Sequence, residues 1–214
     1  MVAAVAATGF LTLAGAALAE NYQYRFTKGD SVLAAQIVHR PSAKGWTGGA
    51  VKPDLSPDPV RCAGYYAPRQ SDLVVTGDKE SHYTYKTGQE LDTDAVVFGS
   101  AAMAEVDWRR GNNQASYFRC LRATWPSLVA PGTKIVSLAP LSMPRVGTHL
   151  FAYRLVFGRS GSRIAIDSIN VARGRVEVEI DQIAQDPSAA DLADMKTADR
   201  LLTSEMGAKL NALG

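Results

Sequence analysis

Hydrophobic and polar residues alternate most regularly in residues 175–181. The apolar set is Val176, Val178 and Ile180, and the charged set is Arg175, Glu177, Glu179 and Asp181. Successive side chains of a β-strand point to opposite faces of its sheet. The alternation therefore predicts a strand with one face buried in the core and the other face in water.

Two more β-rich runs, residues 149–157 and 163–171, precede this strand. Glycine-containing turns at residues 158–161 and 173–174 separate the three runs, which predicts an antiparallel meander. Residues 188–213 follow, and the spacing of their apolar residues predicts an amphipathic helix that covers the apolar face of the meander. The apolar stripe of this helix consists of Leu192, Met195, Leu202, Met206, Leu210 and Leu213.

The upstream part predicts a hairpin, because residues 72–76 and 81–86 flank a Gly-Asp-Lys-Glu segment that is typical of a turn. Strands are also expected at residues 95–98 and 133–141. Helices are expected at residues 31–38, 100–110 and 114–124, with Asp30 and Ser100 as N-caps and Pro126 ending the third helix. Together these elements predict an α+β fold, in which an antiparallel sheet of hairpin and C-terminal meander has helices packed mainly on one face.

The first residues predict export. Residues 2–19 contain no charged residue and end in Ala17-Leu18-Ala19. Signal peptidase accepts small residues at these positions, so residues 1–19 are expected to be a signal peptide that is cleaved before Glu20. No Lys or Arg precedes the apolar run, and an uncleaved membrane anchor is the alternative. Residues 20–214 are then a single exported domain, and only a retained leader would contact the membrane.

Two cysteines, Cys62 and Cys120, lie in the part of the chain that is expected to be exported. An even number of cysteines in an oxidising compartment indicates one disulfide bond. Two buried free thiols are the alternative. The three histidines, His39, His82 and His149, show no ligand spacing with the cysteines, so no metal site is expected.

Charge and motifs argue against several classes of function. The formal net charge is +2, and no basic stripe with interleaved aromatic residues occurs, which argues against nucleic-acid binding. Residues 158–161 read Gly-Arg-Ser-Gly, which falls short of the hydrolase nucleophile motif. Glu177 and Glu179 share one face of their strand, but that face is expected to be solvated, so they do not indicate a glycosidase pair. We expect neither enzyme activity nor a cofactor.

Arg154 and Asp167 interrupt the apolar runs of two neighbouring predicted strands. The turn between the strands would place them opposite each other, so a stabilising cross-strand pair is the first interpretation. The alternative is that Arg154 lines a groove and binds an anionic ligand. Four aromatic residues could likewise line a ligand cleft or simply pack in the core: Tyr83, Tyr85, Trp108 and Tyr117.

Several segments share features with a known family. They are VVFGSAAMAEVDW (96–108), SYFRC (116–120), GTHLFAYRLVF (147–157), IAIDSINVARGRVEVEI (164–180) and AQIVHRPSAKGWTGG (35–49). These segments resemble the PknH-type extracellular sensor domains of actinobacterial receptor Ser/Thr kinases and related exported proteins, which are similar to the Mog1/PsbP scaffold. The resemblance implies an antiparallel sheet, helices on one side and a groove for a small extracytoplasmic ligand. The kinase sensor domains use two intramolecular disulfides, whereas Cys62 and Cys120 allow only one.

These expectations combine into a non-catalytic, sensor-like domain of the cell envelope that binds a small extracytoplasmic molecule or a lipid. The alternative is a secreted protein that binds an envelope protein partner or has a structural role, without a small-molecule site. A secreted hydrolase is a more remote alternative.

Non-reducing mass spectrometry of the exported protein is expected to find Cys62 joined to Cys120. In the chain-entropy description, a disulfide that closes a loop of this length adds about 4 kcal/mol to the free energy of unfolding. Reduction is therefore expected to lower the melting temperature. Two alkylatable thiols in exported material would contradict the prediction.

Overall fold

The computed structural model describes residues 22–38, 41, 44–53, 55, 72–85, 88–111 and 114–213. The helices are α1 (Lys28–Ile37), α2 (Ala101–Gly111), α3 (Gln114–Leu128) and α4 (Ala189–Asn211). The strands are β1 (Gln23–Tyr24), β2 (Trp46–Val51), β3 (Val74–Tyr85), β4 (Glu90–Phe98), β5 (Lys134–Pro140), β6 (His149–Arg159), β7 (Ser162–Arg173) and β8 (Val176–Gln185).

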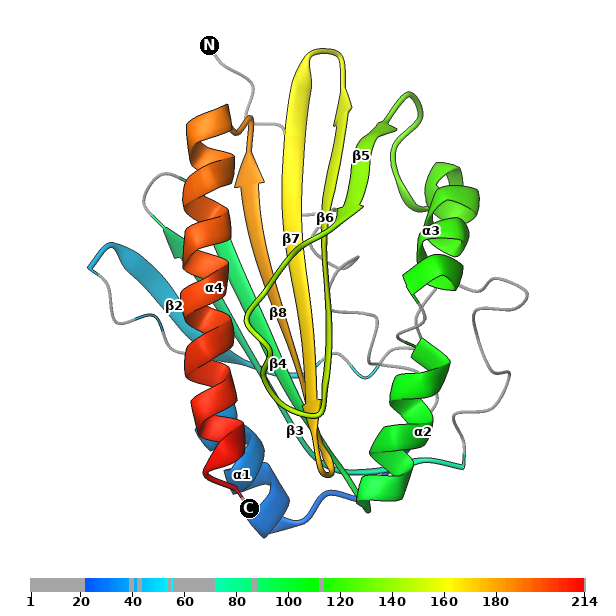
Figure 1. Ribbon diagram of the computed structural model, residues 1–214, viewed down its shortest axis with the longest axis vertical. Coiled ribbons are helices and arrows are strands. Elements are labelled where there is room, and N and C mark those ends of the chain that lie inside the picture. The colour runs from blue at the N-terminus through cyan, green and yellow to red at the C-terminus, as the bar shows by residue number, and fades with distance from the viewer. Residues whose placement is uncertain are drawn as a thin grey trace.

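Within these residues, eight strands form one sheet (Figure 1). The strand order is β1-β3-β4-β8-β7-β6-β5, and β2 also pairs with β3. The pairings are antiparallel, apart from that of the two-residue strand β1 with β3. The predicted α+β fold with an antiparallel sheet is thus confirmed, and its C-terminal meander is β6-β7-β8. The helices, however, are divided between the two faces of the sheet instead of lying mainly on one.

The apolar face of the sheet is covered by α1 and α4, which lie on the same side of it in Figure 1. Ile37 of α1 and Met206 of α4 pack in one cluster with Val97, Val178 and Ile180 of the sheet. Burying a side chain of this size stabilises a fold by about 1.5–3 kcal/mol. This face therefore holds the largest part of the core.

The opposite face of the sheet is covered in part by α2 and α3, which lie on the other side in Figure 1. Trp108 of α2 and Leu121 of α3 pack in one cluster with Phe151, Leu155 and Ile166 of the meander. A second, partly aromatic core therefore forms at the β5–β6 end of this face.

The prediction that the charged set of β8 faces water is wrong. Glu177, Glu179 and Asp181 are only 2%, 3% and 1% exposed. Alternation reports which side chains share a face of the sheet, but it does not report whether that face meets solvent. Here the face opposite the apolar core is buried as well, and it is lined with acids.

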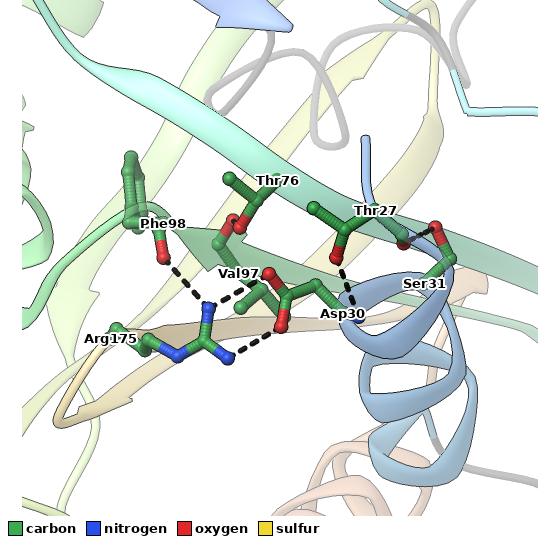
Figure 2. A network of polar contacts seen from close by, with 7 residues as sticks. All are labelled: Thr27, Asp30, Ser31, Thr76, Val97, Phe98 and Arg175. Carbon is green, nitrogen blue, oxygen red and sulfur yellow. Dashed lines mark hydrogen bonds and ion pairs between the residues drawn. The ribbon is translucent and has the colours of Figure 1, made fainter. Parts of the chain in front are cut away.

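Arg175 ties the start of β8 to the first turn of α1 (Figure 2). Its guanidinium donates to both carboxylate oxygens of Asp30, at 2.9 and 2.5 Å, and to the carbonyl oxygen of Phe98 at 3.3 Å. The hydrogen bond from Arg175 is the main reason that the pKa of Asp30 falls from 3.8 to about 2. Such a two-point contact fixes orientation as well as distance, so it holds α1 against the ends of β4 and β8.

The predicted hairpin at residues 72–86 is wrong, because Val74–Tyr85 is one continuous strand that pairs with β4. Gly77 lies inside this strand, where a Cβ atom would come within 2.4 Å of the backbone carbonyl of Asp30. The glycine therefore marks the place where α1 packs closely on β3. It does not mark a turn.

Two helix boundaries also differ from the prediction. The N-cap of α1 is Thr27, whose Oγ1 accepts a hydrogen bond from the Asp30 backbone at 3.1 Å, because the Asp30 side chain is bound to Arg175. Helix α3 runs to Leu128, four residues beyond the predicted end at residue 124. It ends two residues after Pro126, within the one or two residues expected of a proline stop, because a proline in the last turn removes one hydrogen bond of the helix. The predicted Ser100 cap is confirmed by the bond from the Met103 backbone to Ser100 Oγ at 3.2 Å.

Arg154 and Asp167 are confirmed as a cross-strand pair of β6 and β7. Arg154 Nε donates to Asp167 Oδ1 at 2.5 Å, and Arg154 Nη2 donates to Asp167 Oδ2. The same Nη2 also donates to the backbone carbonyl of Leu192 in α4 at 2.9 Å. Because the Asp167 side chain is fully buried, the pair joins α4 to the sheet.

Replacement Arg154→Leu is expected to lower the free energy of unfolding by about 3 kcal/mol, since it leaves the buried Asp167 charge without its partner. Denaturant unfolding measures this change. The double variant Arg154→Leu, Asp167→Leu should recover much of the loss, and the exposed control Arg163→Leu should change stability by less than about 0.5 kcal/mol. A single Arg154→Leu variant that is as stable as the wild type would contradict the expected role.

Candidate functional site

The polar face of the sheet consists of the side chains of β3, β4, β7 and β8 that point away from α1 and α4. Its members are Asp78, Glu80 and His82 of β3, Asp92 and Asp94 of β4, Ser168 and Asn170 of β7, and Glu177, Glu179 and Asp181 of β8. Most of them are acids. Strand alternation brings them to one face, because each strand contributes residues that are two positions apart.

The register of the strands arranges these side chains in rows. One row is Glu80–Asp94–Glu179–Asn170, and the next is His82–Asp92–Asp181–Ser168. Residues directly opposite each other on antiparallel strands have Cβ atoms about 4.5–5.5 Å apart. Carboxylates from three adjacent strands therefore stand side by side.

Burial raises the pKa of these acids, because a site without water disfavours the charged form. The pKa of Asp94 lies well above 3.8, first through burial and then through the negative charge of Asp78. Burial and the charge of Glu80 raise the pKa of Asp78 to about 7. Burial also raises the pKa of Asp181 to about 8. The polar face thus retains protons near neutral pH unless positive charge is supplied to it.

Some of the acids have hydrogen-bond partners: His82 Nδ1 lies 2.5 Å from Asp92 Oδ1, and Ser168 Oγ donates to Glu179 at 3.2 Å. Other buried acids of this face lack a positively charged partner among the described residues. In the described part of the chain, Asp94, Glu177 and Asp181 pair with no basic side chain. Their hydrogen bonds run only to other acids or to a serine hydroxyl. Buried acids are rarely found without a positive partner, so these three carboxyls are the strongest indication of a binding site.

Helix α2 extends the acidic region over one end of this face. Burial, then the charges of Asp107 and Glu105, raise the pKa of Glu177 well above 4.5. Tyr22 Oη donates to Asp107 Oδ1 at 2.7 Å. His149 Nε2 lies 2.6 Å from Glu105 Oε2. Glu177 of β8 is therefore in direct contact with a carboxyl group of α2.

An aromatic cluster borders the acids on the β6 side. Tyr153 lies opposite Ser168 and so continues the row that contains Asp181. Its hydroxyl oxygen is 2.6 Å from that of Tyr117 in α3, and the two ring centroids are 5.2 Å apart. Phe151 packs edge-on against Tyr117, with 5.7 Å between ring centroids. The polar face thus carries carboxylates on β3, β4 and β8 and is bordered by aromatic rings from β6 and α3.

The structure separates the residues that the sequence suggested as a ligand site. Trp108 and Tyr117 lie on the side of the polar face, where Trp108 stacks on His149 with 5.2 Å between ring centroids. Tyr83 lies on the opposite face of the sheet, and Tyr85, whose ring contacts Trp46 at a centroid distance of 5.2 Å, shares that face.

Arg154 is bound to Asp167 beneath α4. Cys120 is buried in α3, whereas Cys62 lies outside the described residues, so the predicted disulfide between them stays a prediction.

Sequence reasoning missed Asp78, Asp92, Asp94 and Asp181 as site residues. A signal was present, because acids recur at every second position in β3, β4 and β8. Reading this signal requires the register of three strands, of which β8 is distant in the chain from β3 and β4, and the register cannot be derived from any one strand.

The chain matches no known protein-family model and no sequence among the curated proteins. The resemblance to PknH-type sensor domains therefore stays a prediction. In the residues that the structure covers, no helix has both the length and the hydropathy needed to cross a bilayer.

Stability is expected to fall as pH rises from about 4 to about 8. The folded-state pKa of Asp181 is raised from 3.8 to about 8, so the folded protein holds a proton that the unfolded chain has already lost over this range. Each such proton lowers the free energy of unfolding by about 1.4 kcal/mol per pH unit. The amide in Asp181→Asn does not titrate, so this variant should show a shallower decline in thermal unfolding experiments.

The exposed variant Asp194→Asn serves as the control and should keep the slope of the wild type. Parallel stability curves for the wild type and Asp181→Asn would contradict the raised pKa of Asp181.

Proposed function

We propose that this chain is an exported, non-catalytic binding domain whose polar sheet face takes a small, positively charged organic ligand. The observation that supports it best is the pair of buried acids on β8, Glu177 and Asp181, which pair with no basic side chain among the described residues. A buried carboxylate without a counter-charge is costly. A bound cation would offset that cost and would stabilise the folded state.

The charge pattern around the polar face supports a cationic ligand in preference to an anionic one. Arg154, Arg175 and Arg110 each bind an acid that lies outside this face, namely Asp167, Asp30 and Asp72. The histidines nearest the acids, His82 and His149, already contact Asp92 and Glu105. An anion placed on the polar face would be repelled by the carboxylates of three strands.

The aromatic border supports an organic ammonium group as part of the ligand. The faces of tyrosine and tryptophan rings attract cations, by about 0.5–2 kcal/mol depending on how far the pair is removed from water. Tyr153 and Tyr117 are placed beside the row that contains Asp181 and Ser168. A ligand that combines an ammonium group with an apolar part would match both chemistries.

Export and a sensor-like role complete the proposal. They rest on the leader at residues 1–19 and on the resemblance to PknH-type extracellular domains. An extracytoplasmic domain that binds a small molecule without transforming it agrees with both. Amino-terminal sequencing of the mature protein should give Glu20 first, and an intact Met1 would indicate a retained membrane anchor.

The binding proposal is tested by calorimetric titration with 1,4-diaminobutane and, as the anionic counterpart, succinate. We expect the diamine to bind and succinate not to bind. Asp181→Asn should weaken the diamine at least tenfold, about 1.4 kcal/mol, whereas the exposed control Asp194→Asn should bind like the wild type. Failure of the diamine to bind, or equal binding by wild type and Asp181→Asn, would count against the proposal.

A further inference from the structure

The β3–β4 hairpin brings together three carboxylates: Asp78, Glu80 and Asp94. Each offers one oxygen, and these three oxygens all lie within 4.8 Å of one another. The register explains the arrangement: Glu80 pairs directly with Asp94 across the two strands, and Asp78 lies two residues before Glu80 on the same face. Consecutive positions on one strand could not produce this convergence, because their side chains point to opposite faces.

Acidic clusters are common on protein surfaces, but Asp94 distinguishes this one. Asp94 is only 7% exposed. No donor from outside the cluster reaches Asp94 Oδ1 or Asp78 Oδ1 among the residues for which the structure gives positions. The two carboxyls are hydrogen-bonded to each other, so one of them must hold a proton. A cation would take the place of this proton and contact both carboxylates.

We propose that Asp78, Glu80 and Asp94 bind one divalent cation, and that this cation is Ca²⁺. The inference rests on the proposed function in one respect, since both require the polar face to accept positive charge. It concerns different residues, because the organic ligand is assigned to the rows nearer Asp181 and Tyr153.

The donor set selects the class of metal. All three donors are carboxylate oxygens, which suit hard cations, whereas Zn²⁺ and Cu²⁺ prefer sites with imidazole or thiolate ligands. Ca²⁺ binds oxygen at about 2.3–2.6 Å, so two oxygens on opposite sides of one ion are about 4.6–5.2 Å apart. Mg²⁺ binds oxygen at about 2.0–2.1 Å, demands a nearly ideal octahedron, and is usually held by only one or two carboxylates with several waters. A set of three carboxylates therefore favours Ca²⁺, with the remaining positions open to water.

The β8 strand strengthens the negative field at this position. Glu179 lies directly opposite Asp94 on the other side of β4, so a fourth carboxylate is next to the triad. The charges of Asp78, Glu80 and Glu179 all act on Asp94. A divalent ion at the triad would reduce repulsion among all four acids, whereas a monovalent ion would compensate less of it.

The test is calorimetric titration of the chelator-treated full-length protein with CaCl₂, with MgCl₂ in parallel. We expect one Ca²⁺ per chain and weaker Mg²⁺ binding. Asp94→Asn and Asp78→Asn should each weaken Ca²⁺ at least tenfold, while Asp181→Asn, on the same face but outside the triad, should stay within about threefold of the wild type. Thermal melts of each variant verify that it folds, and the less buried Asp78→Asn provides the readout if Asp94→Asn does not fold.

The outcomes separate this inference from the proposed function. Ca²⁺ affinity lost in Asp94→Asn but kept in Asp181→Asn supports the metal site, whether or not the diamine binds. Absence of Ca²⁺ binding, unchanged binding in Asp94→Asn and Asp78→Asn, or tighter binding of Mg²⁺ would overturn the Ca²⁺ site. None of these results affects diamine binding that depends on Asp181.

Discussion

Mutual repulsion among buried carboxylates is the constraint on which the rest of the structure depends. Acids that lie opposite one another on β4 and β8, such as Asp94 with Glu179 and Asp92 with Asp181, are held at fixed separations by the sheet. They cannot move apart without breaking the ladder of backbone hydrogen bonds. Their charge must therefore be reduced, either by protons, as the raised pKa of Asp181 indicates, or by cations from solution. The choice between protons and cations is the physical basis for proposing a binding role.

The sheet can tolerate such a face because stability is supplied elsewhere. On the opposite side, α1 and α4 bury apolar residues against the same strands. Two ion pairs hold the helices of that side in place: Arg175 binds Asp30 and Arg154 binds Asp167, each with two hydrogen bonds. Asp199 of α4 is also buried there, and burial next to Asp167 raises its pKa to about 10. The polar face differs in the number of acids that it brings together and in the absence of an arginine bound to Asp94, Glu177 or Asp181 among the described residues.

Much of the fold could be predicted from local patterns. The meander, the C-terminal helix and the pairing of Arg154 with Asp167 follow from alternation, helical spacing and one short turn, which all act over a few residues. The polar face could not be predicted in this way, because the alternating acids of β8 look the same whether they face water or a helix. Their burial depends on β4 and on α2, which are distant in the chain. Gly77 led to a wrong turn prediction for a related reason. The absence of a side chain at this position lets β3 pack closely against Asp30 of α1, which is distant in the chain.

Several carboxyl groups of the polar face are expected to remain protonated near neutral pH when no cation is bound. Carbon-13 NMR of the side-chain carboxyls, followed from pH 3 to pH 10 in chelator-treated protein without added amines, tests this most directly. We expect Asp78 to titrate near pH 7 and Asp181 near pH 8, in line with their pKa values of about 7 and about 8. Titration of both groups near pH 4 would contradict this expectation.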